Sequence, residues 1–117
     1  MKENIVVDKS YKFAIRIINL YKFLVAEKKE YVISKQILRS GTSIGANINE
    51  AQSAESKMDF VHKLSISAKE SRETEYWLKL LNETDYIDKI SFDSICSECN
   101  ELLKIINSII LTSKVRK

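Results

Sequence analysis

The 117-residue chain contains no proline and only two glycines, Gly41 and Gly45. Proline ends or kinks helices and glycine weakens them, so few breaks are enforced along this chain. Long helices joined by short turns are therefore favoured. A chain of this length buries about two-thirds of the surface that its unfolded form exposes, enough for one core without metal or disulfide support. We expect a single domain spanning residues 1–117.

Apolar residues recur at three- and four-residue steps in four segments, as in amphipathic helices. The segments cover residues 8–27, 33–53, 56–82 and 88–113. Asp8 is the predicted N-cap of the first helix, and Ser56 followed by Asp59 resembles a capping box before the third. Breaks of only a few residues separate the segments. The predicted fold is all-α, an antiparallel up-down-up-down four-helix bundle.

The same periodicity predicts which side chains form the core. The stripe predicted for the first helix consists of Ala14, Ile17, Ile18, Tyr21, Leu24 and Val25. The stripe predicted for the second consists of Ile37, Gly41, Ile44, Ile48 and Ala51. Cys96 and Cys99 fall on the apolar stripe of the fourth helix as a lone CxxC pair. A structural zinc site needs four ligands, so we interpret these cysteines as core thiols and expect no metal.

Gly41 and Gly45 both lie in the stretch "RSGTSIGANINEA", four residues apart. A phosphate-binding loop follows a strand and carries lysine before serine or threonine, and neither feature is present. A glycine inside a helix costs about 1 kcal/mol relative to alanine, so two of them need a compensating contact. The missing side chains would let another helix approach closely. We interpret both as helix-packing positions, with a ligand loop as the alternative.

A second face of the same helix is polar and contains Ser40, Ser43, Asn47 and Glu50. In the next helix, Arg72 and Glu75 lie near the angular direction of its apolar stripe. Buried charges must be paired. We therefore predict one polar network, inside or beside the bundle, made of Asn47, Glu50, Arg72 and Glu75. The alternative is a solvated flank.

Basic residues are concentrated in the first two helices, although the net charge is only +3. No acidic residue lies between Asp8 and Glu27. The candidate nucleic-acid-binding residues are Lys9, Lys12, Arg16, Lys22, Lys35 and Arg39. In one chain such a stripe is typical of a solvated face. Several copies in a ring would multiply it into a positive field that attracts a phosphate backbone.

Residues 36–81 carry a resemblance to a known family. Within them, "SIGANINEA" is followed by "DFVHKLSISAKESRETEYWL". These motifs resemble the four-helix-bundle proteins encoded in intervening sequences of bacterial 23S ribosomal RNA genes. Many relatives have proline where Gly45 stands and glycine where Ala51 stands.

The resemblance implies an antiparallel bundle and a homo-oligomer, a pentamer around a central channel. It also suggests a link to nucleic acid, because the family is related to the accessory protein of diversity-generating retroelements, a basic pentameric barrel. We therefore expect a non-catalytic homopentamer that binds RNA or DNA through its first two helices. The alternative is a protein-protein interaction scaffold, favoured by the near balance of 19 basic and 16 acidic residues.

The sequence also predicts where the protein works. No run of about 18 apolar residues is present, so we expect no membrane partner. The N-terminal residues are charged where a signal peptide needs an apolar region. Two cysteines are too few for a secreted disulfide framework. We expect a cytoplasmic protein that is not an enzyme and has no cofactor.

Overall fold

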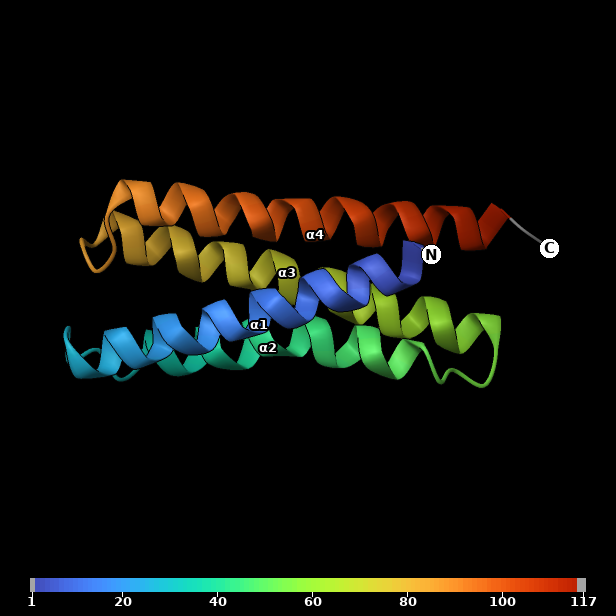
Figure 1. The fold of residues 1–117 in the computed structure, drawn as a ribbon, viewed down its shortest axis with the longest axis horizontal. Helices are drawn as coiled ribbons and strands as arrows, with labels where there is room; N and C mark the ends of the chain where they lie inside the picture. Colours follow the sequence, from blue (N-terminus) through green and yellow to red (C-terminus); the bar gives the residue numbers. More distant parts are fainter. Residues whose placement is uncertain (1, 116–117) are drawn as a thin grey trace.

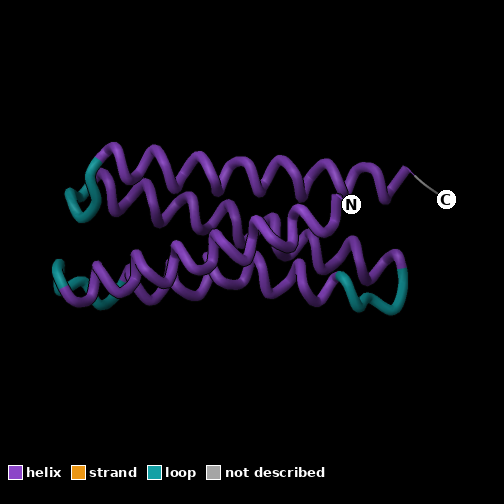
Figure 2. Tube along the Cα trace, in the orientation of Figure 1, coloured by secondary structure: helices purple, strands orange, loops and turns teal. Residues whose placement is uncertain are grey.

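The computed structural model describes residues 2–115, which form four α-helices (Figure 1). The helices are α1 (Lys2–Ala26), α2 (Ile33–Ala51), α3 (Lys57–Glu83) and α4 (Lys89–Val115). Each helix runs back along the one before it, and short turns join them (Figure 2). The bundle is 49 Å long and about 20 Å across. The predicted all-α four-helix bundle is confirmed.

Side chains of the residues directly before α3 and α4 cap these two helices. At α3, the Ser56 hydroxyl accepts a hydrogen bond from the Asp59 N–H at 3.0 Å, so the predicted N-cap is confirmed. The Asp59 carboxylate in turn accepts from the Glu55 N–H at 3.2 Å. At α4, the Asp88 carboxylate accepts from the Ser91 N–H at 2.7 Å. Such caps satisfy N–H groups that have no partner within the first turn.

The prediction that Asp8 caps α1 is wrong. The helix already begins at Lys2, and Asp8 lies inside it, paired with Lys12 at 3.1 Å. The reason is that Val6 is only 1% exposed and belongs to the core. A helix that started at Asp8 would leave this valine outside the regular packing.

The core face of α1 is also rotated from the predicted stripe. The fully buried residues are Val6, Phe13, Ile17 and Leu24, whereas Ile18 is 38% exposed. Helix α1 carries apolar residues on more than one face, so its three- and four-residue steps fit two different stripes. Only the neighbouring helices decide which stripe is buried.

Helices α1 and α2 approach closely at the two glycines. A Cβ atom on Gly41 would stand 2.7 Å from Cγ1 of Ile17, and one on Gly45 would stand 3.3 Å from the carbonyl oxygen of Ser10. Both glycines are helical and buried. They therefore lie where α1 packs against α2, and not in a loop.

Helices α2 and α3 meet through small buried hydroxyl groups. The Ser67 hydroxyl donates to the Ile44 carbonyl at 2.8 Å, and the Thr74 hydroxyl is 2.9 Å from that of Ser40. Among the described side chains, no buried nitrogen or oxygen lacks a hydrogen-bond partner. These bonds hold α2 and α3 together and fix their register, because a shift along either helix would leave buried polar groups without hydrogen-bond partners.

Helices α1 and α4 make the least extensive contact of the four neighbouring pairs. Figure 1 shows them close together near the N-terminal end of α1 and diverging toward the α1–α2 and α3–α4 turns. The bundle is thus tightly packed along three seams and open along the fourth.

We predict that Gly41→Ala destabilises the protein. The added methyl group would overlap Ile17, which is fully buried and cannot move aside. Overpacking of this kind costs about 1–3 kcal/mol, against a gain of about 1 kcal/mol in helix propensity. Urea denaturation should therefore show a net loss in the free energy of unfolding.

The matched test is a double-mutant cycle with Ile17→Ala. The smaller side chain removes the overlap, so Gly41→Ala should become neutral or stabilising in that background. Gly45→Ala should cost less than Gly41→Ala, because its closest contact is longer. Equal costs of Gly41→Ala in both backgrounds would contradict this account of the seam.

Candidate functional site

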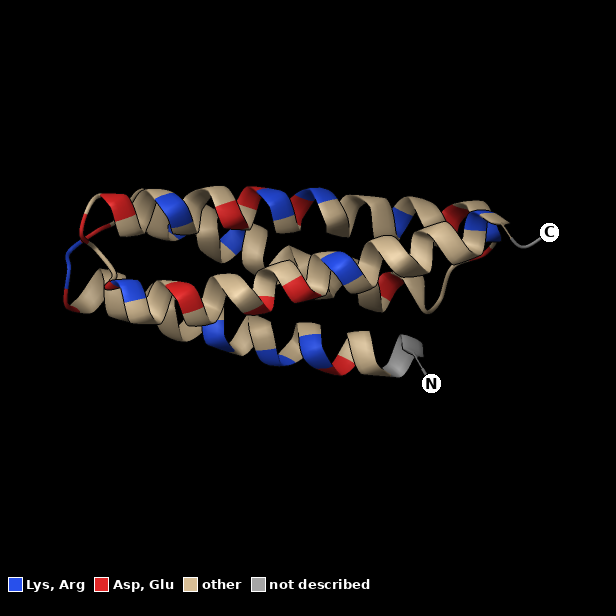
Figure 3. Cartoon of the chain, turned by 90° about the horizontal axis from the view of Figure 1, so that it is seen from above, with Lys and Arg blue, Asp and Glu red and all other residues tan. Residues whose placement is uncertain are grey.

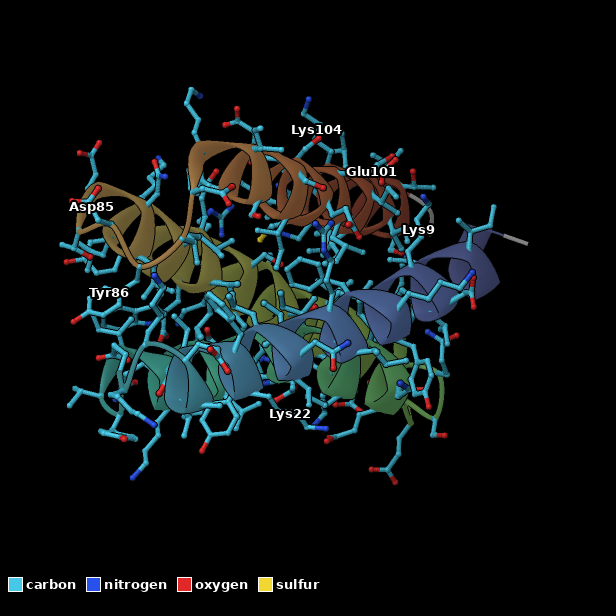
Figure 4. The ribbon with its side chains drawn as sticks, turned by 60° about the vertical axis from the view of Figure 1, so that its left-hand side comes forward. Lys9, Lys22, Asp85, Tyr86, Glu101 and Lys104 are labelled. Atoms are coloured by element: carbon cyan, nitrogen blue, oxygen red, sulfur yellow. The ribbon has the colours of Figure 1, made fainter. Side chains whose placement is uncertain are left out.

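Two of the predicted basic residues bridge α1 and α4. Lys9 pairs with Glu101 at 3.3 Å (Figure 4). Arg16 forms an ion pair with Glu98 and donates to the Ser94 hydroxyl at 2.8 Å. Both pairs cross the open seam, and their side chains are partly exposed. These cations already hold carboxylates of their own chain.

Arg39 is likewise occupied, because it pairs with Glu70 at 3.3 Å and with Glu73 on α3. The hydrogen bond to Glu73 is the main reason that the pKa of Arg39 is raised. The pKa of Glu73 is lowered, first by the hydrogen bond that the Trp77 indole donates at 3.0 Å. Trp77 is partly buried against the core. Figure 3 shows charges of both signs interspersed along α4, whereas the charged residues of α1 between Asp8 and Glu27 are all basic.

Lys22 and Lys35 differ from the other candidates. Both are exposed, and neither takes part in an ion pair within residues 5–115. Lys28 and Lys29, in the α1–α2 turn, share these two properties. We call Lys22, Lys28, Lys29 and Lys35 the turn lysines. Lys28 and Lys29 were not predicted, because they lie in the break between the first two predicted helices and not on a helical face.

A buried carboxylate holds the α1–α2 turn in place. Glu30 is 8% exposed and accepts hydrogen bonds from the N–H groups of Val32, Ile33 and Ser34 at 3.2, 3.0 and 2.6 Å. The Ser34 hydroxyl donates to the Glu30 carbonyl at 2.8 Å. Burial by itself would raise the pKa of Glu30, but these hydrogen bonds outweigh it and lower the pKa. Glu30 therefore caps α2, and its negative charge is stabilised by hydrogen bonds from backbone N–H groups rather than by an ion pair with lysine.

Within residues 5–115, no hydrogen bond or ion pair joins the four residues of the predicted polar network to one another. Asn47 donates to the Ser43 carbonyl at 2.8 Å, and Glu50 pairs with Lys63 at 2.8 Å. Glu75 accepts from the Cys96 thiol at 3.8 Å, whereas Arg72 is exposed. The α2–α3 seam is instead filled by hydroxyl side chains, which are short enough to be buried between two close helices.

The two cysteines lie in the core. Cys99 is 1% exposed and its thiol lies 3.3 Å from the Ser71 carbonyl. Burial is the main cause that raises the pKa of Cys99 to about 12 and also raises that of Cys96. Both groups therefore stay as thiols at neutral pH and are poor nucleophiles. Residues 2–115 contain no cluster of three or more His, Cys, Asp or Glu side chains suited to a metal ion.

Comparison with known proteins agrees with the resemblance. The family model of the 23S rRNA-intervening sequence proteins matches residues 2–108. The chain belongs to this family. A crystal structure from Bacteroides thetaiotaomicron, described as a protein of unknown function from the S23 ribosomal protein family, is 60% identical with a TM-score of 0.93. The match covers 94% of this chain and 98% of that one.

A search of curated proteins gives no match. Across residues 2–115, no helix combines the length and apolar character needed to cross a bilayer. The family and its fold are thus established.

We predict that Glu30→Gln destabilises the protein by about 0.5–2 kcal/mol at pH 7, the usual range for a lost cap. Because the folded pKa of Glu30 is lowered, its carboxylate contributes fully above the ordinary value of 4.5. This contribution is lost as the pH falls through the lower folded value. Urea denaturation at pH 7 and at pH 3 should show the difference between wild type and variant shrinking in acid.

Glu27→Gln is the matched control, since Glu27 is exposed in the same turn. It should change stability little at either pH. A Glu30→Gln difference that stays constant from pH 7 to pH 3 would contradict the proposed role of the charge.

Proposed function

We propose that this chain is a non-catalytic helical scaffold that self-associates through the outer face of α1. The observation that carries this proposal is a row of exposed apolar side chains on that face, Tyr11, Ile15 and Ile18. They are 63%, 46% and 38% exposed. We call these three residues the outer stripe.

The position of the outer stripe follows from helix geometry. Its residues are spaced by four and three, so they share one face of α1. At about 100° per residue, this face points away from the side that carries the buried Phe13 and Ile17. Within residues 2–115, no other helix covers the outer stripe. Exposed apolar rows of this kind are typical of surfaces that bind another protein.

Two further points support self-association. The resemblance to the 23S rRNA-intervening sequence family implies a pentamer. In a symmetric pentamer, the five outer stripes would make equivalent contacts. The isolated bundle already satisfies its buried polar groups within residues 5–115. A contact with another copy can therefore be made by exposed side chains alone. We place the protein in the cytoplasm, where the thiols of Cys96 and Cys99 remain reduced.

We predict that the wild-type protein has a mass of about five times the 13.5 kDa of one chain in light scattering coupled to size exclusion. The double variant Tyr11→Ser, Ile15→Ser should shift to lower mass. Each substitution removes an exposed apolar side chain that would be buried at the interface, worth about 1.5–3 kcal/mol per residue.

Met58→Ser is the matched control, because Met58 is 82% exposed but lies at the start of α3. It should keep the wild-type mass. Circular dichroism should show the same helicity for all three proteins. A monomeric wild type, or a double variant of unchanged mass, would contradict the proposal.

A second candidate function is binding of RNA or DNA through the turn lysines. These four cations have no carboxylate partner within residues 5–115, whereas Lys9, Lys12, Arg16 and Arg39 are paired. The Glu30 charge beside them is held by backbone N–H groups. The α1–α2 turn therefore keeps a cluster of lysines without ion pairs, with Glu27 in the same turn and Asp85 and Asp88 across the adjacent groove. Such a cluster attracts a phosphate backbone, and more strongly when several copies assemble.

We predict that a labelled single-stranded RNA is retarded in a low-salt gel shift and released as salt increases. Replacing Lys22, Lys29 and Lys35 by glutamine should weaken binding. If all three contact phosphates, the slope of log affinity against log salt should decrease by about 2. No retardation at low salt would defeat this second function.

The control removes the same charge elsewhere, with Lys57, Lys69 and Lys79 replaced by glutamine. These lysines are exposed on α3. If both triple variants lose affinity equally, the binding reflects net charge alone and the turn lysines are not a site.

A further inference from the structure

A groove opens where α1 and α4 diverge. It has a volume of about 640 Å³ and lies between the second half of α1, the α3–α4 turn and the first turns of α4. Its apolar lining consists of Leu20, Phe23, Tyr86, Ile87 and Ile95. Tyr86 extends from the α3–α4 turn toward α1 (Figure 4). Phe23 is 40% exposed although it faces four other apolar side chains. An apolar surface is therefore presented to whatever enters the groove.

The two rims of the groove carry opposite charges. Arg16, which is already paired with Glu98, and Lys28 lie on the α1 side. The Lys28 ammonium is 5.9 Å from the centre of the Phe23 ring. Asp85 and Asp88 lie on the α3–α4 side. Farther along the seam the charges are mixed, because α1 contributes Asp8 beside Lys9 and Lys12, and α4 contributes Lys104 beside Glu98 and Glu101. A partner complementary to the groove itself would have one acidic flank, one basic flank and an apolar face between them.

An α-helix meets this description. Its side chains at i, i+3, i+4 and i+7 form an apolar face with two separate flanks. The α1 wall from Arg16 to Phe23 spans about 10 Å at 1.5 Å per residue, so two turns of a partner helix would match it. Two smaller hollows, of about 270 and 380 Å³, continue along the same seam toward the other end of α1. The Arg16–Glu98 and Lys9–Glu101 ion pairs cross the seam between these hollows, so a longer helix that follows α1 would have to displace them.

We infer that the α1–α4 seam binds an amphipathic helix of a partner protein, with acidic residues against α1 and basic residues against α4. This inference deepens the proposed scaffold function by assigning it a client site. It uses a face of α1 different from the outer stripe. The client helix occupies the place of a fifth helix and covers Leu20, Phe23 and Tyr86.

The probe is a labelled synthetic helix of about four turns with leucine on one face, glutamate on one flank and lysine on the other. Fluorescence anisotropy should show saturable binding to the wild-type protein. Phe23→Ser should weaken binding about ten- to a hundredfold, as expected when one buried phenylalanine side chain is lost. Tyr76→Ser, which removes a 57% exposed ring on α3, is the matched control and should leave the affinity unchanged.

Peptide charge provides an independent test. Helices with the same leucine face but two acidic or two basic flanks should each bind more weakly than the split-flank helix, because one rim then repels them. Lys28→Glu should weaken the split-flank helix and strengthen the helix with two basic flanks. Absence of binding, equal affinity for all three peptides, or equal affinity of wild type and Phe23→Ser would overturn the inference.

Self-association must be separated from client binding. Light scattering of Phe23→Ser without peptide should give the wild-type mass, and a lower mass would mean that the groove is a contact between copies, overturning the inference. The Tyr11→Ser, Ile15→Ser variant should still bind the split-flank helix. Loss of the oligomer with retained peptide binding, or a monomeric wild type that binds the peptide, would therefore separate the two proposals.

Discussion

The close approach of α1 and α2 at Gly41 and Gly45 is the contact on which the remaining packing depends. With Ile17 and the Ser10 backbone pressed against these glycines, α1 is drawn toward α2 over its middle turns. Helix α2 is held on its other side by the hydroxyl contacts of Ser67 and Thr74 with α3. Small residues allow close backbones in both seams. Helix α1 therefore follows α2, and its contact with α4 is reduced.

This asymmetry determines which charges remain available. Across the open seam, exposed ion pairs join α1 and α4. Exposed pairs contribute little to stability, about 0–1 kcal/mol each, so the seam is the least constrained part of the bundle. The same pairs occupy two of the six cations that made α1 and α2 look like a phosphate-binding surface. The lysines without ion pairs lie in and beside the α1–α2 turn, next to the apolar groove and opposite Asp85 and Asp88.

Sequence periodicity was sufficient to predict four helices in a bundle, but it did not identify which face of each helix is buried. Four amphipathic segments, few helix breakers and the Ser56 cap predicted four helices whose bounds differ from the observed ones mostly by one or two residues. The start of α1 was wrong by six residues because Val6 is buried by neighbours that lie far away in the chain. Ile18 was assigned to the core because apolar residues on an exposed helix face recur at the same three- and four-residue steps as those on a buried face. The network around Arg72 failed for a related reason, since spacing does not tell which flank meets a neighbour.

The amino-acid sequence alone determined the helical class, the family and the special role of the two glycines, because each depends on local propensity or on a contiguous motif. Tertiary structure decided the partners of the charged residues. Arg16 and Glu98 are 82 positions apart, and only the crossing of α1 and α4 brings them together. Tertiary structure also decided that the α1–α4 seam stays open, because α1 lies closer to α2 than to α4. Such a difference is set by all four helices packing at once and by no segment of the chain separately.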